Sequence, residues 1–172
     1  MQLEHLDDYV LGTTKDELLC LGEEENQAVS LAMTQQAEFH LDILSYDLDP
    51  PIYDTDEFCQ RVENLALRSR HSRIRILLHQ PQKVVRRGHL LIYLGRRLGS
   101  LIQFRQLAPV YQNQVETFML VDKIAFMHRE FRDALRMTAN FCDGKRVKEL
   151  TRLFNQYWED SEPDPDTHFL LL

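Results

Sequence analysis

The spacing of apolar residues alternates between strand and helix patterns over the first two thirds of the chain. Apolar residues at every second position predict a strand over 39–45, and an increasingly apolar run predicts a buried strand over 73–78. A third strand is expected over 101–105. Helical spacing predicts three helices before and between these strands, over 23–37, 56–70 and 81–98. Such an order of helices and strands is typical of a mainly parallel sheet covered on both faces.

The pattern changes after residue 116, where strand-like segments follow one another with short connections. They are expected to extend the sheet in antiparallel fashion, over 117–121, 123–127 and 135–141. An amphipathic helix over 145–160 follows, and its spacing predicts that Trp158 is a packing residue. A short edge strand is expected over 9–12. The run 46–51 ends in two prolines, which neither a helix nor a central strand would tolerate. An extended turn is therefore expected there.

These elements predict one α/β domain spanning 1–172, because the chain has 172 residues. The expected fold is a three-layer α/β/α sandwich with a mixed, mainly parallel sheet. Residues 1–22 form an N-terminal extension in this prediction, and residues 161–172 form an acidic and apolar tail.

Composition narrows the class of protein. The hydrophobic content of 44% is normal for a globular chain, and no apolar run approaches the ~20 residues of a membrane span. The acidic N-terminus lacks the basic start of a signal peptide, so a cytoplasmic location is expected. Three distant cysteines and seven scattered histidines show no metal-site spacing, and the acidic loop 47–56 lacks the pattern of a calcium loop. We therefore expect neither a metal nor a cofactor.

The charges are unevenly distributed along the chain. The net charge is −7, yet the 52 residues between Glu63 and Glu116 contain no acidic residue and ten basic ones. The rest of the chain carries −17. Such asymmetry indicates an anionic partner, or an acidic surface on another copy of the chain. The alternative interpretation is a basic face that is only solvated.

A candidate anion site follows from this charge window. Strand carboxyl ends and helix N-termini form the usual anion crevice of an α/β unit, which would place His79 and Lys83 at its mouth. The other basic residues of the predicted helix 81–98 lie largely opposite its apolar stripe. The candidate anion-binding residues are His79, Lys83, Arg86, Arg87, Arg96 and Arg97. Base stacking is not supported within the window, which holds only Tyr93, Phe104 and Tyr111.

The sequence resembles the phospholipase D-like superfamily, and in particular a bacterial branch of uncharacterised function that is often linked to acetyltransferase-like proteins. The resemblance spans roughly residues 24–168 and includes a hairpin with Val121-Asp122. Its most similar segments are 43–50 (ILSYDLDP), 73–78 (RIRILL), 87–89 (RGH) and 157–164 (YWEDSEPD).

Active members of that superfamily carry His-x-Lys-x₄-Asp followed by a Gly-Ser pair. In this chain Asp122 matches the motif's Asp, whereas Val115 and Thr117 occupy the His and Lys positions, and Arg129 and Glu130 the Gly-Ser positions. A hydrocarbon cannot attack phosphorus, and Thr carries no charge to neutralise phosphoryl oxygens. The resemblance therefore implies a domain that is not an enzyme, in which Asp122 is a turn residue of the hairpin.

Two functions remain open on the sequence. One is a non-catalytic module that binds nucleic acid or a phosphorylated ligand on the basic face. The other is a homodimeric or protein–protein interaction module that uses the same face, because active phospholipase D-like proteins join two such halves.

Overall fold

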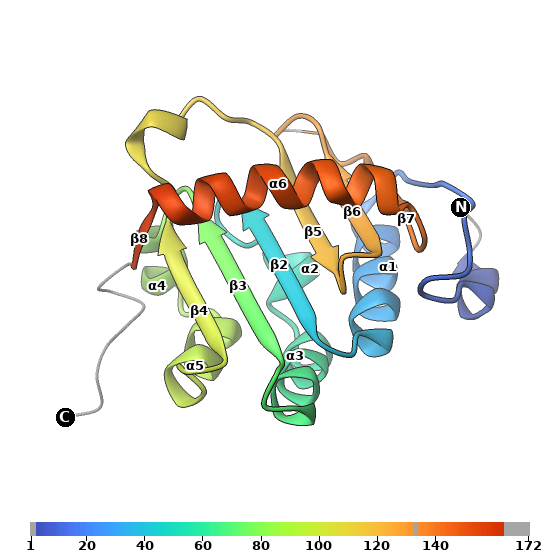
Figure 1. Ribbon diagram of the computed structural model, residues 1–172, viewed down its shortest axis with the longest axis horizontal. Helices are drawn as coiled ribbons and strands as arrows, with labels where there is room; N and C mark the ends of the chain where they lie inside the picture. The colour runs from blue at the N-terminus through green and yellow to red at the C-terminus, as the bar shows by residue number, and fades with distance from the viewer. Residues whose placement is uncertain (1–2, 133, 164–172) are drawn as a thin grey trace.

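The chain folds into three layers, with one sheet between two layers of helices (Figure 1). The computed structural model describes residues 3–132 and 134–163. Helix α6 (Gly144–Asp160) crosses one face of the sheet alone. The other face is covered by α1 (Glu23–Gln36), α2 (Pro50–Tyr53), α3 (Asp56–Arg68), α4 (Pro81–Arg87) and α5 (Leu90–Arg97). The predicted α/β/α architecture is confirmed.

The sheet is mixed, as predicted, and its eight described strands follow the order β1-β7-β6-β5-β2-β3-β4-β8. Only β2–β3 and β3–β4 pair in parallel; the other five pairings are antiparallel, so the sheet is less parallel than predicted. The strands are β1 (Leu18–Cys20), β2 (His40–Ser45), β3 (Arg73–Leu78), β4 (Ile102–Gln106), β5 (Thr117–Val121), β6 (Ala125–Arg129), β7 (Met137–Asn140) and β8 (Glu162–Pro163).

The two ends of the chain contribute edge strands. The expected strand over 9–12 is wrong: Thr13 and Thr14 donate to the carbonyl of Val10, and Gly12 has φ 79°, which makes a turn there. Strand β1 lies at that edge instead, so part of the 1–22 extension belongs to the sheet. At the other edge β8 pairs with β4, while residues 164–172 of the predicted tail lie outside the described residues.

Two proline- and glycine-containing segments also differ from the prediction. The helix expected over 81–98 is broken, because Gly88 at φ 77° ends α4 and the ring of His89 accepts the amide of Leu91 at the start of α5. The pair Pro50-Pro51 does not form an extended turn. Pro50 begins the short helix α2, at the position where its missing N–H costs nothing.

The face under α6 has its own apolar core, separate from the larger one beneath α1–α5. Phe154 and Trp158 stack at 5.8 Å between ring centroids, and Trp158 is 8% exposed, so its predicted packing role is confirmed. Beneath them Arg75 donates twice to Asp42 at 2.7 Å, and its guanidinium lies 4.8 Å from the Phe154 ring. This buried ion pair is satisfied on both sides, as burial of charge requires.

Helix length and apolarity do not reach what a membrane crossing needs anywhere in the described part of the chain.

Candidate anion-binding site

The carboxyl ends of β2, β3 and β4 and the start of β5 lie side by side along one edge of the sheet. This edge is formed by strand ends and is distinct from the edge strands β1 and β8. Because β6 is antiparallel to β5, its last residue, Arg129, returns to the same edge opposite Thr117. A crevice of about 120 Å³ lies there. We call it the crevice, and it is lined by Tyr46, Asp47, Asp49, Thr117, Arg129 and Arg132.

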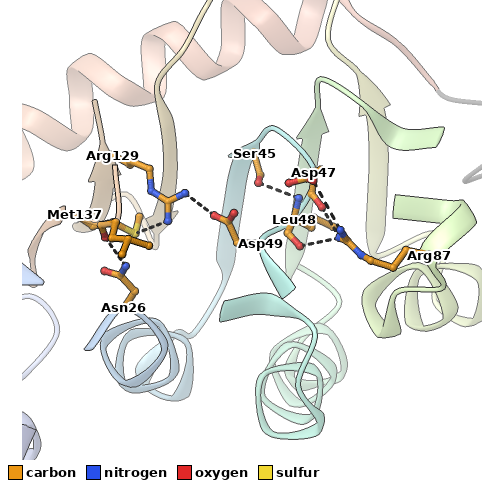
Figure 2. Close-up of polar contacts among 9 residues, drawn as sticks. Asn26, Ser45, Asp47, Leu48, Asp49, Arg87, Arg129 and Met137 are labelled. Atoms are coloured by element: carbon orange, nitrogen blue, oxygen red, sulfur yellow. Dashed lines mark hydrogen bonds and ion pairs between the residues drawn. The ribbon is translucent and has the colours of Figure 1, made fainter. Parts of the chain in front are cut away.

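The loop after β2 forms one wall of the crevice and is held from two sides (Figure 2). Leu48 has φ 51°, and its amide donates to Ser45 Oγ at 3.0 Å. Arg87 of α4 donates to the carbonyls of Asp47 and Leu48 at 2.7 and 3.3 Å. From the opposite side Arg129 donates to Asp49 Oδ2 at 2.8 Å. Two guanidinium groups therefore fix the loop, and the candidate residue Arg87 supplies one of them.

Arg129 places a positive charge beside the position where the phospholipase D-like motif has Lys. The predicted strand 123–127 is shifted to Ala125–Arg129, because Asp122 and Lys123 form the hairpin turn at φ 51° and 59°. This register sets Arg129 directly opposite Thr117. Arg129 is 7% exposed and contacts Met137 Sδ at 3.8 Å. The edge thus retains a cation although Thr117 has none.

Three nitrogen-bearing side chains surround the ring of Tyr46. Arg132 lies 3.1 Å from the ring centroid, Lys83 lies 5.4 Å away, and the imidazole of His79 packs at 5.4 Å between centroids. Burial lowers the pKa of His79, so this ring is neutral at neutral pH. Lys83 and Arg132 are both exposed, and they supply the positive charge that solvent or a ligand meets here.

The predicted candidate residues are divided between two regions. His79 and Lys83 contact Tyr46 at the crevice, and Arg86 is exposed on α4 beside Arg87. In contrast, Arg96 and Arg97 lie in the last turn of α5, which leads into the start of β4 at the opposite edge of the sheet. Arg97 pairs there with Glu63 of α3, and Arg96 lies 5.9 Å from the Tyr93 ring. The structure does not bring these two arginines to the crevice.

Asp122 lies at the far end of β5, and its carboxylate binds backbone amides. Its carboxylate accepts three amides that precede or begin β2: Glu38 at 2.6 Å, Phe39 at 2.8 Å and His40 at 2.7 Å. Its φ of 51° makes it a hairpin turn residue, as predicted. The matching residue of the motif therefore joins two strands at the edge away from the crevice.

The acidic residues of the loop after β2 bind protein groups. Asp47 and Asp49 face the two arginines, and Asp54 Oδ1 accepts the amide of Leu90 at 2.8 Å and lies 3.5 Å from the ring of His89. Burial lowers the pKa of His89 to about 4. Among the residues described, no group of three or more His, Cys, Asp and Glu side chains is placed to hold a metal.

A second histidine at this edge belongs to the α6 side of the sheet. His128 Nε2 is 2.8 Å from Glu116 Oε2, and its Nδ1 is 3.5 Å from Arg146. The hydrogen bond from His128 lowers the pKa of Glu116. His128 is 4% exposed and packs near Phe118, whose neighbours are the α6 core. Both of its nitrogens are engaged, and it does not line the crevice.

Sequence reasoning missed the crevice residues that lie outside the charge window. Arg129 and Arg132 follow Glu116, so a search for an acid-free segment could not find them. One signal was available: Arg129 occupies a position where the resembling family has Gly, and a long cation at that point predicts a filled or altered site.

The solved structures show which fold this is. TrmBL2, an archaeal chromatin protein described as having a novel mode of DNA binding, matches 94% of this chain with a TM-score of 0.64 and 14% identity. The chain spans 58% of the length of TrmBL2. Two further structures cover 87% of this chain and 99% of their own: Nuc from Salmonella typhimurium, a phospholipase D family member, with a TM-score of 0.58 and 10% identity, and NucT from Helicobacter pylori, with 0.61 and 9%.

These likenesses establish a phospholipase D-like fold. No curated protein matches the chain in sequence. A family described as a domain of unknown function, DUF7931, matches residues 22–170. This match covers most of the chain, which therefore belongs to the DUF7931 family.

Proposed function

We propose that this chain is a non-catalytic phospholipase D-like domain that binds the phosphate backbone of a nucleic acid at the crevice. The observation that carries the proposal is that a different side chain supplies the positive charge at the position of the motif's Lys. Thr117 stands at the motif's Lys position, but Arg129 lies opposite it, with Lys83 and Arg132 around Tyr46. The edge keeps positive charge and places a hydrocarbon, Val115, where a nucleophile would stand.

The electrostatics favour capture of an anion from solvent. Lys83 and Arg132 are exposed and contact the ring of Tyr46, and within the described residues neither has a carboxylate partner, so little charge has to be displaced when a phosphate arrives. Arg129 is paired with Asp49, which is 32% exposed and can turn to solvent when a phosphate replaces it. The DNA-binding description of TrmBL2, which shares this fold, supports nucleic acid as the source of the phosphate.

Salt-dependent binding tests this proposal. Fluorescence anisotropy with labelled single-stranded and duplex DNA should give affinities that fall steeply as NaCl increases, because each neutralised phosphate releases about one counterion. The double variant Lys83→Gln/Arg132→Gln should flatten the plot of log affinity against log salt by up to about two units. Absence of salt-dependent binding to either DNA would overturn the proposal.

A matched control separates the crevice from general basicity. The double variant Arg96→Gln/Arg97→Gln removes the same charge from the opposite edge, and its salt slope should stay within about half a unit of the parent's. Mass measured in solution on the same proteins tests the interaction-module alternative. If Lys83→Gln/Arg132→Gln converted a dimer into monomers and left DNA binding unchanged, the crevice would be a contact between copies instead.

A lack of hydrolysis belongs to the same proposal. Incubation with a chromogenic phosphodiester and with DNA should give no turnover, because neither Val115 nor Thr117 can perform the motif's chemistry. Turnover that disappears on changing His79 or Arg129 would contradict this part of the proposal while leaving the binding site in place.

A further inference from the structure

The cations of the crevice converge on one point instead of following a line. Arg129 and Arg132 both line the crevice, and Lys83 lies 5.4 Å from the Tyr46 ring that Arg132 contacts at 3.1 Å. Proteins that follow the backbone of a strand use a positively charged groove that extends over about 4–16 nucleotides. The basic residues in the last turn of α5, which would have extended such a groove, lie at the opposite edge of the sheet. This arrangement favours recognition of a single phosphate group.

The size of the crevice agrees with a single group. Its volume is about 120 Å³, and a water molecule in the liquid occupies about 30 Å³, so the crevice has room for roughly four water-sized groups. A phosphoryl group presents a comparable number of oxygen atoms. Pockets that enclose a whole drug-sized ligand measure about 300–1,000 Å³. A sugar and a base would therefore remain outside the crevice.

Arg129 is a buried cation whose hydrogen-bonding capacity is only partly used. One terminal nitrogen donates to Asp49 Oδ2 at 2.8 Å, and the other faces Met137 Sδ at 3.8 Å (Figure 2). Its buried Nε has no hydrogen-bond partner among the described residues. A guanidinium carries five N–H donors, and a thioether is only a weak acceptor. Burial of this charge therefore leaves donors that a second anion can satisfy.

The net charge of the crevice matches a dianion. The charged groups that line it or hold its wall are the cations Lys83, Arg87, Arg129 and Arg132 and the carboxylates of Asp47 and Asp49. The four cations exceed the two carboxylates by two charges. A phosphomonoester carries about −1.5 to −2 at pH 7, as phosphorylated side chains do. Each internal phosphodiester of a strand carries a single negative charge. The monoester therefore neutralises the crevice more completely.

We propose that the crevice binds a terminal phosphomonoester, the phosphorylated end of a nucleic-acid strand, in preference to an internal phosphodiester. This inference rests on the proposed function and specifies which phosphate group enters. The terminal phosphoryl group takes the place of Asp49 at Arg129, beside Thr117, which also lines the crevice. Lys83 and Arg132 are exposed and contact the phosphates that follow along the strand.

Oligothymidine strands that differ only in their end groups test the inference. Fluorescence anisotropy compares a strand with a 5′-phosphate, a strand with a 3′-phosphate and a strand with two hydroxyl ends. One phosphorylated strand should bind about 10- to 100-fold more tightly than the hydroxyl strand, because it gains charge-assisted hydrogen bonds.

Thymidine monophosphate as a competitor separates the two sources of a phosphomonoester. It should displace the phosphorylated strand only at concentrations at least about tenfold above the Kd of the strand, because it lacks the phosphates that follow. Displacement at concentrations equal to that Kd would assign the crevice to free nucleotides and overturn the choice of strand ends.

Two variants assign the preference to the crevice. Arg129→Lys keeps a positive charge but loses the fork of donors, so the preference for the phosphorylated end should fall at least about fivefold. Urea denaturation shows whether this variant is folded. Thr117→Val removes a hydroxyl donor and should reduce the preference about three- to tenfold. In contrast, Lys83→Gln/Arg132→Gln should weaken binding of the phosphorylated and hydroxyl strands alike.

Arg97→Lys is the matched control. Arg97 pairs with the carboxylate of Glu63 at the opposite edge of the sheet, so the exchange should leave the preference unchanged. Equal, salt-dependent affinities for the phosphorylated and hydroxyl strands would overturn the inference and leave the proposed function standing. So would a preference that survives both Arg129→Lys and Thr117→Val, because the phosphorylated end would then bind elsewhere. If the parent bound no strand, the proposed function would fail and the inference with it.

Discussion

The two parts of the phospholipase D-like motif fall at opposite ends of strand β5, and the side chains at these two ends have different roles. At the far end Asp122 accepts three backbone amides and joins the hairpin to the start of β2. At the crevice end Val115 is exposed and Thr117 faces Arg129. The residue that matches the motif is the one that holds the architecture together. A match to a motif's structural member is therefore no evidence for its chemistry.

The electrostatic state of the two ends differs as well. The carboxylate of Asp122 is engaged by three backbone amides. At the crevice Lys83 and Arg132 contact the ring of Tyr46 and, among the described residues, neither pairs with a carboxylate, while Arg129 pairs with Asp49, which is 32% exposed. Substitutions at the far end should therefore change stability, whereas those at the crevice should change binding.

The largest effect is expected for Asp122→Ala. The change removes three hydrogen bonds to a charged acceptor and places Ala at φ 51°. It should lower the free energy of unfolding by about 3–5 kcal/mol, measured by urea denaturation. DNA affinity of the folded fraction should remain that of the parent.

Asp122→Asn provides the graded control. Asn tolerates positive φ, and its carbonyl oxygen can still accept the amides of Phe39 and His40, which both bind Oδ1. Its amide group cannot accept the amide of Glu38. The loss should therefore be smaller, about 1–2 kcal/mol. An Asp122→Ala variant with unchanged stability but weakened DNA binding would break the comparison between the two ends.

The next largest effect is a dependence of the free energy of unfolding on pH, and it arises from a residue that packs behind the crevice loop. His89 starts α5 behind the loop, and burial lowers its pKa from 6.5 to about 4. Between these values the unfolded chain binds more protons than the folded one, so stability falls as pH decreases from 6.5 towards 4. The full loss should reach up to about 3 kcal/mol.

Urea denaturation of the parent and His89→Asn across this pH range measures the effect. Asn keeps a helix-capping oxygen but cannot titrate, so its unfolding free energy should vary less with pH than the parent's. His79 and His40, whose pKa values are also lowered, contribute in the same direction to both proteins. An identical pH dependence in the two proteins would remove His89 as its source.

The sequence predicted the elements better than the site because the two depend on different information. Period-two and period-3.6 patterns are local, and they located β2, β3, α3 and α6 within a few residues. The break between α4 and α5 was missed, because the apolar stripe continues through Gly88-His89 while the backbone does not. A side-chain pattern does not report a positive φ.

The topology of the sheet explains why the candidate anion-binding residues lie in two separate regions. Residues 81–97 run from the carboxyl end of β3 back to the start of β4, so Lys83 and Arg97 lie at opposite edges of the sheet. Arg129 and Arg132 reach the crevice through an antiparallel hairpin whose register depends on where the turn residues fall. Strand β6 begins two residues later than the predicted strand, and the register that follows from the turn decides which side chain faces Thr117.

A smaller effect is expected for Asp49→Asn at the crevice. The change keeps an acceptor for Arg129 but removes the charge that competes with phosphate. Anisotropy titrations should show tighter DNA binding and a salt slope that is steeper by up to about one unit. Stability should decrease by no more than about 1 kcal/mol, because the carboxylate is partly solvated. Weaker DNA binding would show that Asp49 positions Arg129 rather than competing for it.

The smallest change in stability is expected for Val115→His, which restores the motif's first residue at the crevice end of β5. Val115 is 51% exposed, so the unfolding free energy should change by less than about 0.5 kcal/mol. A chromogenic phosphodiester should still not be hydrolysed, because a nucleophile also needs its phosphoryl oxygens neutralised, and Arg129 is held by Asp49. Combining Val115→His with Asp49→Asn removes the negative charge that competes for that guanidinium. Turnover by the double variant, but not by Val115→His alone, would mean that Arg129 can replace the motif's Lys. Only the nucleophile and the competing carboxylate would then separate this crevice from a catalytic one.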